Sequence, residues 1–241
     1  MRYEEQINLE LQQWILQLQK KPGILEKSSR GLSKKINQKI PKKAHDTITA
    51  AIKGMIQSII YGVDITPKGK VLATELPLQI KDQKAKEWIK KYKKIGAIEG
   101  AGTGAGGIFL GLVDFPALLS IKMKLLFELA HIYGFNTKYF HERLYILNIF
   151  QLAFSGYDHR LKTLSSIHNW DSTAKTLNDP DSIDWEKFQQ EYRDSLDFRK
   201  MLQMLPGIGA VVGAWANFGL IQELGDTAMN CYRLRILKSE V

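Results

Sequence analysis

Apolar residues recur every three or four positions along most of the chain. Near the N-terminus this spacing is shown by Ile7, Leu11, Trp14, Ile15 and Leu18. Such a stripe is typical of one face of an amphipathic helix, which is expected to end near residues 22–23. The same spacing predicts helices at residues 25–40, 41–61, 138–154, 160–177, 185–205 and 206–237. No segment alternates as a strand does, so we expect an all-α fold, a single multi-helix bundle.

The domain organisation follows from the connections. Residues 63–80 contain Pro67, Gly69 and Pro77 and are expected to connect helices. They are the best place for a domain boundary, but no low-complexity linker marks one. The sequence therefore predicts one helical domain over residues 1–241, in which residues 1–62 form a basic, amphipathic N-terminal part.

Glycines gather in residues 96–111, where seven of sixteen positions are Gly. The preceding basic helix, with Trp88, Ile89 and Tyr92, has no stop signal. Gly102, Gly104 and Gly107 match G-x-G-x-x-G, but a phosphate-binding loop of this kind follows a buried strand. Here the preceding residues are charged and helical in pattern, so the match is interpreted as accidental.

The same segment has nearly the length of a membrane span. Residues 100–121 include one ionisable residue, Asp114. Asp is a good N-cap and Pro116 suits a first helical turn, so a break is predicted near Val113, followed by a helix that Gly134 closes. Residues 100–113 would then extend about 21 Å, short of the ~30 Å hydrocarbon core. A single crossing is disfavoured, whereas a hairpin that reaches partway into one leaflet stays open.

Close helix packing is the third interpretation. Small residues four positions apart let another backbone approach. The spacing recurs in the uncharged stretch 202–221, so we expect two glycine-rich helix pairs at the centre of the bundle, with a packing strip at Gly100, Gly104, Gly107, Gly111, Gly209 and Gly213. Whether these helices are buried core or insert in lipid is left open, because both use the same apolar residues.

Charge is unevenly distributed, with a net charge of +9. Residues 20–43 and 81–94 are rich in lysine, whereas residues 179–197 are acidic. The pattern predicts a basic surface for an anionic partner. Anionic lipid is favoured over nucleic acid because lysine dominates and the first basic run has no aromatic residue. The residues expected to meet the membrane are Lys20, Lys21, Lys34, Lys35, Lys42, Lys43, Lys90, Lys91, Lys93 and Lys94.

Compartment and chemistry are constrained by what the sequence contains. Cys231 is the only cysteine, and the first ten residues are polar and acidic, unlike a secretory signal. A cytoplasmic protein at the inner face of the cell membrane is therefore expected. Glu128 and His131 have a spacing found in metal-binding bundles, but a single copy does not predict a metal, and no cofactor is expected.

Two longer blocks resemble a known family. GGIFLGLVDFPALLSIKMKLLFELAHIYGF and LPGIGAVVGAWANFGLIQELGDTAMNCYRLRIL are similar to the two signature blocks of the EcsC family. The resemblance implies a membrane-associated accessory protein whose operon also encodes an ABC transporter, so transporter components are expected partners. It assigns no biochemical role and no oligomeric state.

Within these blocks we consider five residues as candidates for ligand binding: Asp114, Asn217, Asp226, Arg233 and Arg235. Asp114 is more simply a helix N-cap, and Asn217 could meet it across a helix pair. The two arginines suit the end of a helix, with an anionic headgroup or phosphate as the alternative. The principal hypothesis is an accessory protein that binds anionic lipid or an apolar ligand. The alternative is a hydrolase acting on a lipid-like substrate near Asp114, although no catalytic motif supports it.

Overall fold

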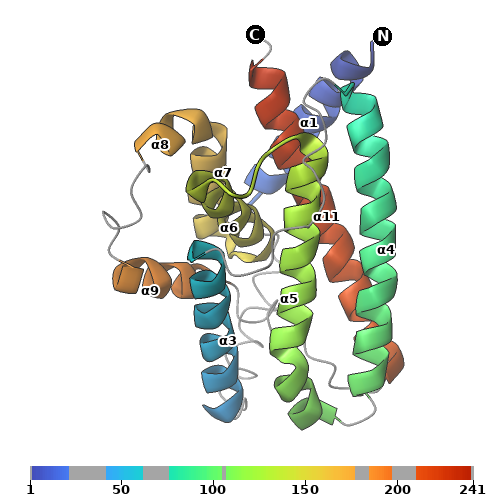
Figure 1. Cartoon of the computed structure of the whole chain (residues 1–241), viewed down its shortest axis with the longest axis vertical. Helices are drawn as coiled ribbons and strands as arrows, with labels where there is room; N and C mark the ends of the chain where they lie inside the picture. The colour runs from blue at the N-terminus through green and yellow to red at the C-terminus, as the bar shows by residue number, and fades with distance from the viewer. Residues whose placement is uncertain are drawn as a thin grey trace.

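The computed structural model describes residues 2–21, 42–61, 76–104, 107–176, 185–196 and 210–239, without the side chains of residues 43–45, 99–104, 107–112, 176, 185, 210–217 and 239. The described residues form helices and no strand (Figure 1). The helices are α1 (Tyr3–Gln19), α3 (Lys42–Ile60), α4 (Leu78–Gly104), α5 (Gly107–Tyr133), α6 (Phe140–Phe154), α7 (Tyr157–His168), α8 (Trp170–Thr176), α9 (Trp185–Ser195) and α11 (Ala210–Ser239). The predicted all-α bundle is confirmed.

Three long helices, α4, α5 and α11, stand side by side (Figure 1). α4 packs against both others. It runs antiparallel to α5, from which only residues 105–106 separate it, and Figure 1 shows that it also runs antiparallel to α11. The end of α4 therefore lies beside the beginnings of α5 and α11, at the bottom of Figure 1. We call residues 99–104, 107–112 and 210–217 the glycine-rich end. Its helices are in place, but the predicted glycine strip lies outside the described side chains, and Gly209 lies outside the described residues.

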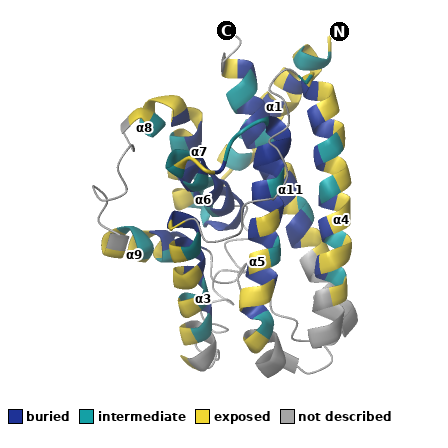
Figure 2. Ribbon diagram, viewed as in Figure 1, coloured by how far each residue is buried: buried dark blue, intermediate teal, exposed yellow. Residues whose placement is uncertain are grey.

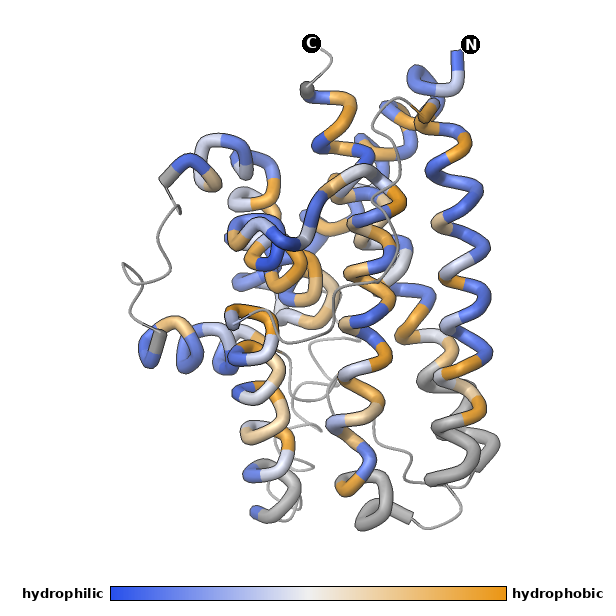
Figure 3. Tube along the Cα trace, in the orientation of Figure 1, coloured by the Kyte–Doolittle hydropathy of each residue, from blue (hydrophilic) through white to orange (hydrophobic). Residues whose placement is uncertain are grey.

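α6 lies at the centre of the other half of the molecule. It is apolar around most of its circumference, as expected of a helix without a solvent face, and it packs against α3, α7 and α11. In Figure 2 the buried residues lie in α6 and on the sides of the three long helices that face the interior. Figure 3 shows that the residues at these places are largely apolar. Buried apolar side chains from all of these helices belong to one hydrophobic cluster.

The predicted break near Val113 is wrong. α5 begins at Gly107 and passes without interruption through Asp114 and Pro116, so Asp114 is not an N-cap. A proline inside a helix costs about 3 kcal/mol. Here Pro116 itself is exposed, while its neighbours Phe115 and Leu118 are buried. Burial of that apolar side holds the helix in register through the proline.

The other helix ends agree only in part with the sequence predictions. Gly134 closes α5 as predicted, with a positive φ of 95° and a hydrogen bond from Phe135 N to Ala130 O. The helix predicted at residues 160–177 is two helices that meet at Asn169. α9 ends at Ser195, earlier than predicted, next to a bridge between Leu196 and Ser155. The helix predicted at residues 25–40 lies outside the described residues, so the single-domain prediction stays a prediction.

Candidate functional site

A buried ion pair joins α4 to α11. Asp82 is 1% exposed, and its Oδ2 receives Nε and Nη2 of Arg233 at 3.0 and 2.9 Å. Arg233 also reaches Oδ1 of Asn230 at 3.1 Å and the half-exposed Glu10 of α1 at 3.5 Å. Burial opposes the charge on Arg233, but the hydrogen bond and the charge of Asp82 outweigh it, so the pKa of Arg233 is raised.

Two tyrosines complete the environment of Asp82. Tyr3 of α1 donates its hydroxyl to Oδ2 at 2.6 Å, and Tyr133 of α5 donates to Oδ1 at 2.5 Å. Burial, together with the adjacent carboxylate, raises the pKa of Tyr3 to about 12 and that of Tyr133 well above 10. Both hydroxyls therefore stay protonated as donors. Four helices thus meet at one carboxylate, which satisfies a charge that would be costly to bury alone.

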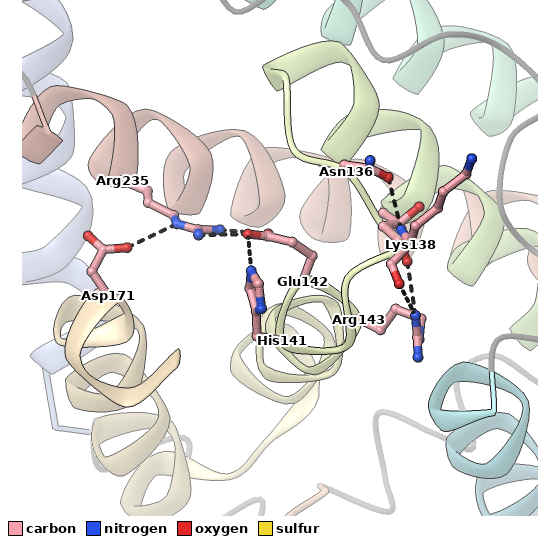
Figure 4. Close-up of polar contacts among 8 residues, drawn as sticks. Asn136, Lys138, His141, Glu142, Arg143, Asp171 and Arg235 are labelled. Atoms are coloured by element: carbon pink, nitrogen blue, oxygen red, sulfur yellow. Dashed lines mark hydrogen bonds and ion pairs between the residues drawn. The ribbon is translucent and has the colours of Figure 1, made fainter. Parts of the chain in front are cut away.

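A second ion pair lies on the other side of α11 (Figure 4). Arg235 donates both terminal nitrogens to the carboxylate of Glu142, each at 2.7 Å, and its Nε reaches Asp171 at 3.3 Å. The guanidinium also lies over the rings of Phe135 and Tyr145, at 4.2 and 4.9 Å from their centroids. Burial opposes its charge, but the hydrogen bond and charge of Glu142 outweigh it and raise the pKa of Arg235.

These contacts place the two candidate arginines. Both hold acids of this chain. Arg233 places two nitrogens on one oxygen of Asp82, whereas Arg235 meets both oxygens of Glu142 in the paired geometry that also suits phosphate. Arg233 and Arg235 lie two positions apart on α11, so one faces α4 and the other faces α6. The arrangement clamps α11 between the two halves of the molecule.

The three remaining candidates are not brought into one site by the described residues. Asp114 is half-buried on α5, near the glycine-rich end. Asp226 is exposed on α11, where it accepts a hydrogen bond from Gln222 at 2.8 Å. The side chain of Asn217 lies outside the description, so its contact with Asp114 stays a prediction.

Two glycines set the close approach of α4 and α11. A methyl group on Gly225 would lie 2.6 Å from Cγ1 of Ile89, and one on Gly96 would collide with Cδ1 of Ile221. Gly96 belongs to the small-residue spacing seen in the sequence, whereas Gly225 was not singled out. Close packing by glycine is therefore present along α4, above the glycine-rich end.

The predicted membrane lysines are scattered over several helices. Lys90, Lys91 and Lys94 are exposed on α4. Lys93 is half-buried, with Nζ over the ring of Phe218 at 3.9 Å and hydrogen bonded to Gln222. Lys20 and Lys21 are exposed after α1, and Lys42 is exposed at the start of α3. Lys34 and Lys35 lie outside the described residues, as does the side chain of Lys43.

Four open clefts are bordered by residues that the structure describes. Two clefts, of about 630 and 580 Å³, share His168. The first lies between α8 and the end of α11, and the second follows α7, where Ile15, Leu161 and Leu164 border it. The other two, of about 330 and 390 Å³, lie between α3 and α9 and on α4. Asp114 lines none of the four, so the hydrolase hypothesis stays a prediction.

Glu128 and His131 lie in different environments. His131 is buried, with Nε2 at 2.8 Å from the Thr137 hydroxyl, and burial lowers its pKa. Glu128 is half-buried on α5, where burial raises its pKa against the opposing effect of Lys91. Among the described residues, no group of three or more metal-ligating side chains is gathered. No helix in the described ranges has the length and apolar character needed to span a membrane.

Comparison with known proteins gives a family match over nearly the whole chain. The model of the EcsC protein family matches residues 5–237. The chain belongs to the EcsC protein family. Both signature blocks identified in the sequence lie within the matched range.

Two curated relatives extend this assignment. Protein EcsC of Bacillus subtilis (strain 168) is 46% identical over 226 residues, which cover 94% of this chain and 93% of the relative. The uncharacterized protein YdbA of the same organism is 30% identical over 160 residues, or 66% of this chain and 59% of the relative. No solved structure matches the chain.

Sequence reasoning missed the partners of both arginines. Asp82 sits in a lysine-rich run where it resembles any surface acid, and Glu142 follows His141 without a motif. Tyr133 lies in the first of the two family blocks, but nothing in the sequence marks its hydroxyl as the donor to Asp82. One sequence signal was available. A charged residue on a helix face that is predicted to be buried needs a partner of opposite charge, because an unpaired buried charge is costly.

Proposed function

We propose that this chain is a peripheral membrane protein that docks on anionic lipid through α4 and acts as an accessory to an ABC transporter. The observation that carries the docking proposal is the lysine face of α4, defined as Lys86, Lys90, Lys91 and Lys94, all exposed. Among the described side chains, one exposed acidic residue, Glu87, lies between these lysines. α4 stands at the edge of the molecule in Figure 1, and its outer side is strongly hydrophilic in Figure 3.

The electrostatics of this face favour an anionic leaflet. A lysine near such a surface contributes about 1 kcal/mol. The other acid at the start of α4, Asp82, is buried and neutralised by Arg233, so it does not cancel the face. Trp88 lies half-buried beside the face, with Lys91 over its ring at 4.3 Å. Tryptophan next to lysine is common where proteins meet the headgroup region.

The transporter role rests on the family resemblance alone, and we assign no contact residues to it. The principal hypothesis from the sequence also allowed binding of an apolar ligand. The groove of about 580 Å³ between α1 and α7 is the described cleft whose apolar borders suit it best.

Vesicle flotation tests the docking proposal. The protein should float with vesicles of phosphatidylcholine mixed with phosphatidylglycerol, remain in solution with phosphatidylcholine alone, and be released by salt. Replacing all four lysines of the face by glutamine should weaken partitioning at least about tenfold.

The control carries the same charge change elsewhere, at the exposed Lys53, Lys138, Lys162 and Lys187. Equal recovery with neutral and anionic vesicles, or equal losses in the two variants, would exclude docking through this face.

A further inference from the structure

Exposed apolar side chains border the glycine-rich end on three neighbouring helices. Ile98 of α4 is 73% exposed, Val113 of α5 is 72% exposed, and Phe218 of α11 is 40% exposed. Ile95 of α4 lies one turn away and is 36% exposed. We call Ile98, Val113 and Phe218 the apolar ring. Single exposed apolar residues are normal, but a cluster on adjacent elements marks a contact surface.

The members of the apolar ring lie at one level of the bundle. Ile98 is six residues before the end of α4, and Val113 is six residues after the beginning of α5. At 1.5 Å per residue, both lie about 9 Å from these ends, and Phe218 lies about 12 Å from the beginning of α11. The contact of Gly96 with Ile221 fixes α4 against α11 at nearly the same level.

Beyond the apolar ring, the described ends of these three helices almost lack charge. Residues 99–104, 107–112 and 210–217 contain one ionisable residue, Glu99. Helix ends that face water usually carry polar or charged residues, because their terminal backbone groups need partners. This end is therefore composed for an apolar medium, although none of its helices in the described ranges could span a membrane.

Lysines lie on the side of the apolar ring that faces away from the glycine-rich end. Lys94 precedes Ile98 by one helical turn, about 6 Å, and Lys90 and Lys91 lie a further turn away. Lys93 places its Nζ over the aromatic ring of Phe218. In Figure 1, α3 begins at this same end, where Lys42 is exposed. An apolar tip below a belt of cations matches the order of an anionic leaflet, with acyl chains below charged headgroups.

We infer that the bundle docks end-on, with the glycine-rich end inserted into one leaflet of an anionic membrane and the lysine belt in its headgroups. The inference rests on the proposed function and specifies its geometry. The depth is limited because Glu99, next to Ile98, and Asp114, next to Val113, would be costly in hydrocarbon, so both are expected at the level of the headgroups. The inserted length is thus about 9–12 Å, far less than a ~30 Å core.

Site-specific labelling tests the geometry. A polarity-sensitive fluorophore is attached to single cysteines placed at Ile98 or Val113, with Leu16 and Tyr139 as exposed controls away from this end. The native Cys231 can stay, because it is buried and burial raises the pKa of its thiol. With phosphatidylcholine–phosphatidylglycerol vesicles, the labels at 98 and 113 should shift to the blue and lose quenching by aqueous iodide. The labels at 16 and 139 should not change.

A variant that needs no label provides the second measurement. Ile98→Ser with Val113→Ser and Phe218→Ser should bind anionic vesicles at low salt but lose at least about tenfold in partitioning at 0.15 M salt. The lysine face is untouched in this variant, so encounter by charge should persist.

The outcomes separate the two proposals. Charge-dependent flotation without any change at 98 and 113 would leave peripheral docking intact and overturn end-on insertion. Equal shifts at all four labelled positions would also overturn it, and absence of flotation would overturn both. A shift without vesicles that grows with protein concentration would show that a second copy covers this end, which likewise overturns insertion.

Discussion

Arg233 of α11 and Asp82 of α4 lie 151 positions apart in the sequence and form an ion pair in which both side chains are buried. Tyr3 and Tyr133 donate to the same carboxylate, so the pair joins helices from both ends of the chain. A buried pair of this kind adds little net stability, but loss of one partner leaves an unpaired charge in the core.

We expect Arg233→Met to lower the free energy of unfolding by about 3–5 kcal/mol. Asp82→Asn should cost less, because the amide can still accept and donate hydrogen bonds. Urea denaturation followed by circular dichroism measures both. In the double variant Asp82→Leu with Arg233→Met, the loss should be smaller than the sum of the losses of Asp82→Leu and Arg233→Met measured singly, and strict additivity would argue that the pair is not coupled.

Arg235 allows a comparison of two acids around one guanidinium. Glu142 is buried and held by two hydrogen bonds, whereas the Asp171 side chain is 61% exposed and receives one longer contact. Glu142→Gln should therefore destabilise the protein by about 2 kcal/mol or more, and Asp171→Asn by less than about 1 kcal/mol. Thermal melts of the two variants, recorded beside the parent protein, give the order, and a reversed order would contradict the clamp.

The glycine contacts predict opposite signs for the same substitution. Gly225→Ala places a methyl group against Ile89 and should destabilise the protein by about 1–3 kcal/mol. Gly54→Ala in α3 meets nothing within 4 Å and should stabilise it by up to about 1 kcal/mol. Ile89→Val, which removes a methyl group near Gly225, should recover part of the loss. Denaturant midpoints measure all three, and equal effects at both glycines would exclude close packing at Gly225.

Lys122 predicts a pH dependence. It is fully buried in α5, and burial lowers its pKa to about 7. The unfolded chain keeps the proton to about pH 10, so between pH 7 and 9 the unfolded state binds more protons than the folded state. The free energy of unfolding therefore rises with pH in this window, by at most about 1.4 kcal/mol per pH unit from this group.

Lys122→Met should remove that contribution. The variant should exceed the parent protein most clearly at pH 6.5–7, and the difference should shrink toward pH 9. Urea unfolding at four pH values measures it, with the exposed Lys124→Met as the matched control. Parallel stability curves for Lys122→Met and the parent protein would show that Lys122 keeps its proton throughout the window.

Much of the helical architecture could be predicted, because helix periodicity and terminal signals are local. α1, α3 and α6 were expected nearly where they lie, and Gly134 closes α5 because a positive φ suits glycine. The same local rules failed at Pro116. There, Phe115 and Leu118 are buried against other helices, which offsets the cost of the proline, and no rule confined to neighbouring residues contains that contribution.

The candidate site divides in the same way. The sequence alone determined the family blocks and the basic balance, and it named Arg233 and Arg235 as candidates, because composition and motif are properties of the chain itself. Only the tertiary structure decided that Asp82 and Glu142 hold those arginines, and that Ile98, Val113 and Phe218 share one level of the bundle. Burial and pairing depend on which distant helices meet, and that is settled by packing over the whole fold.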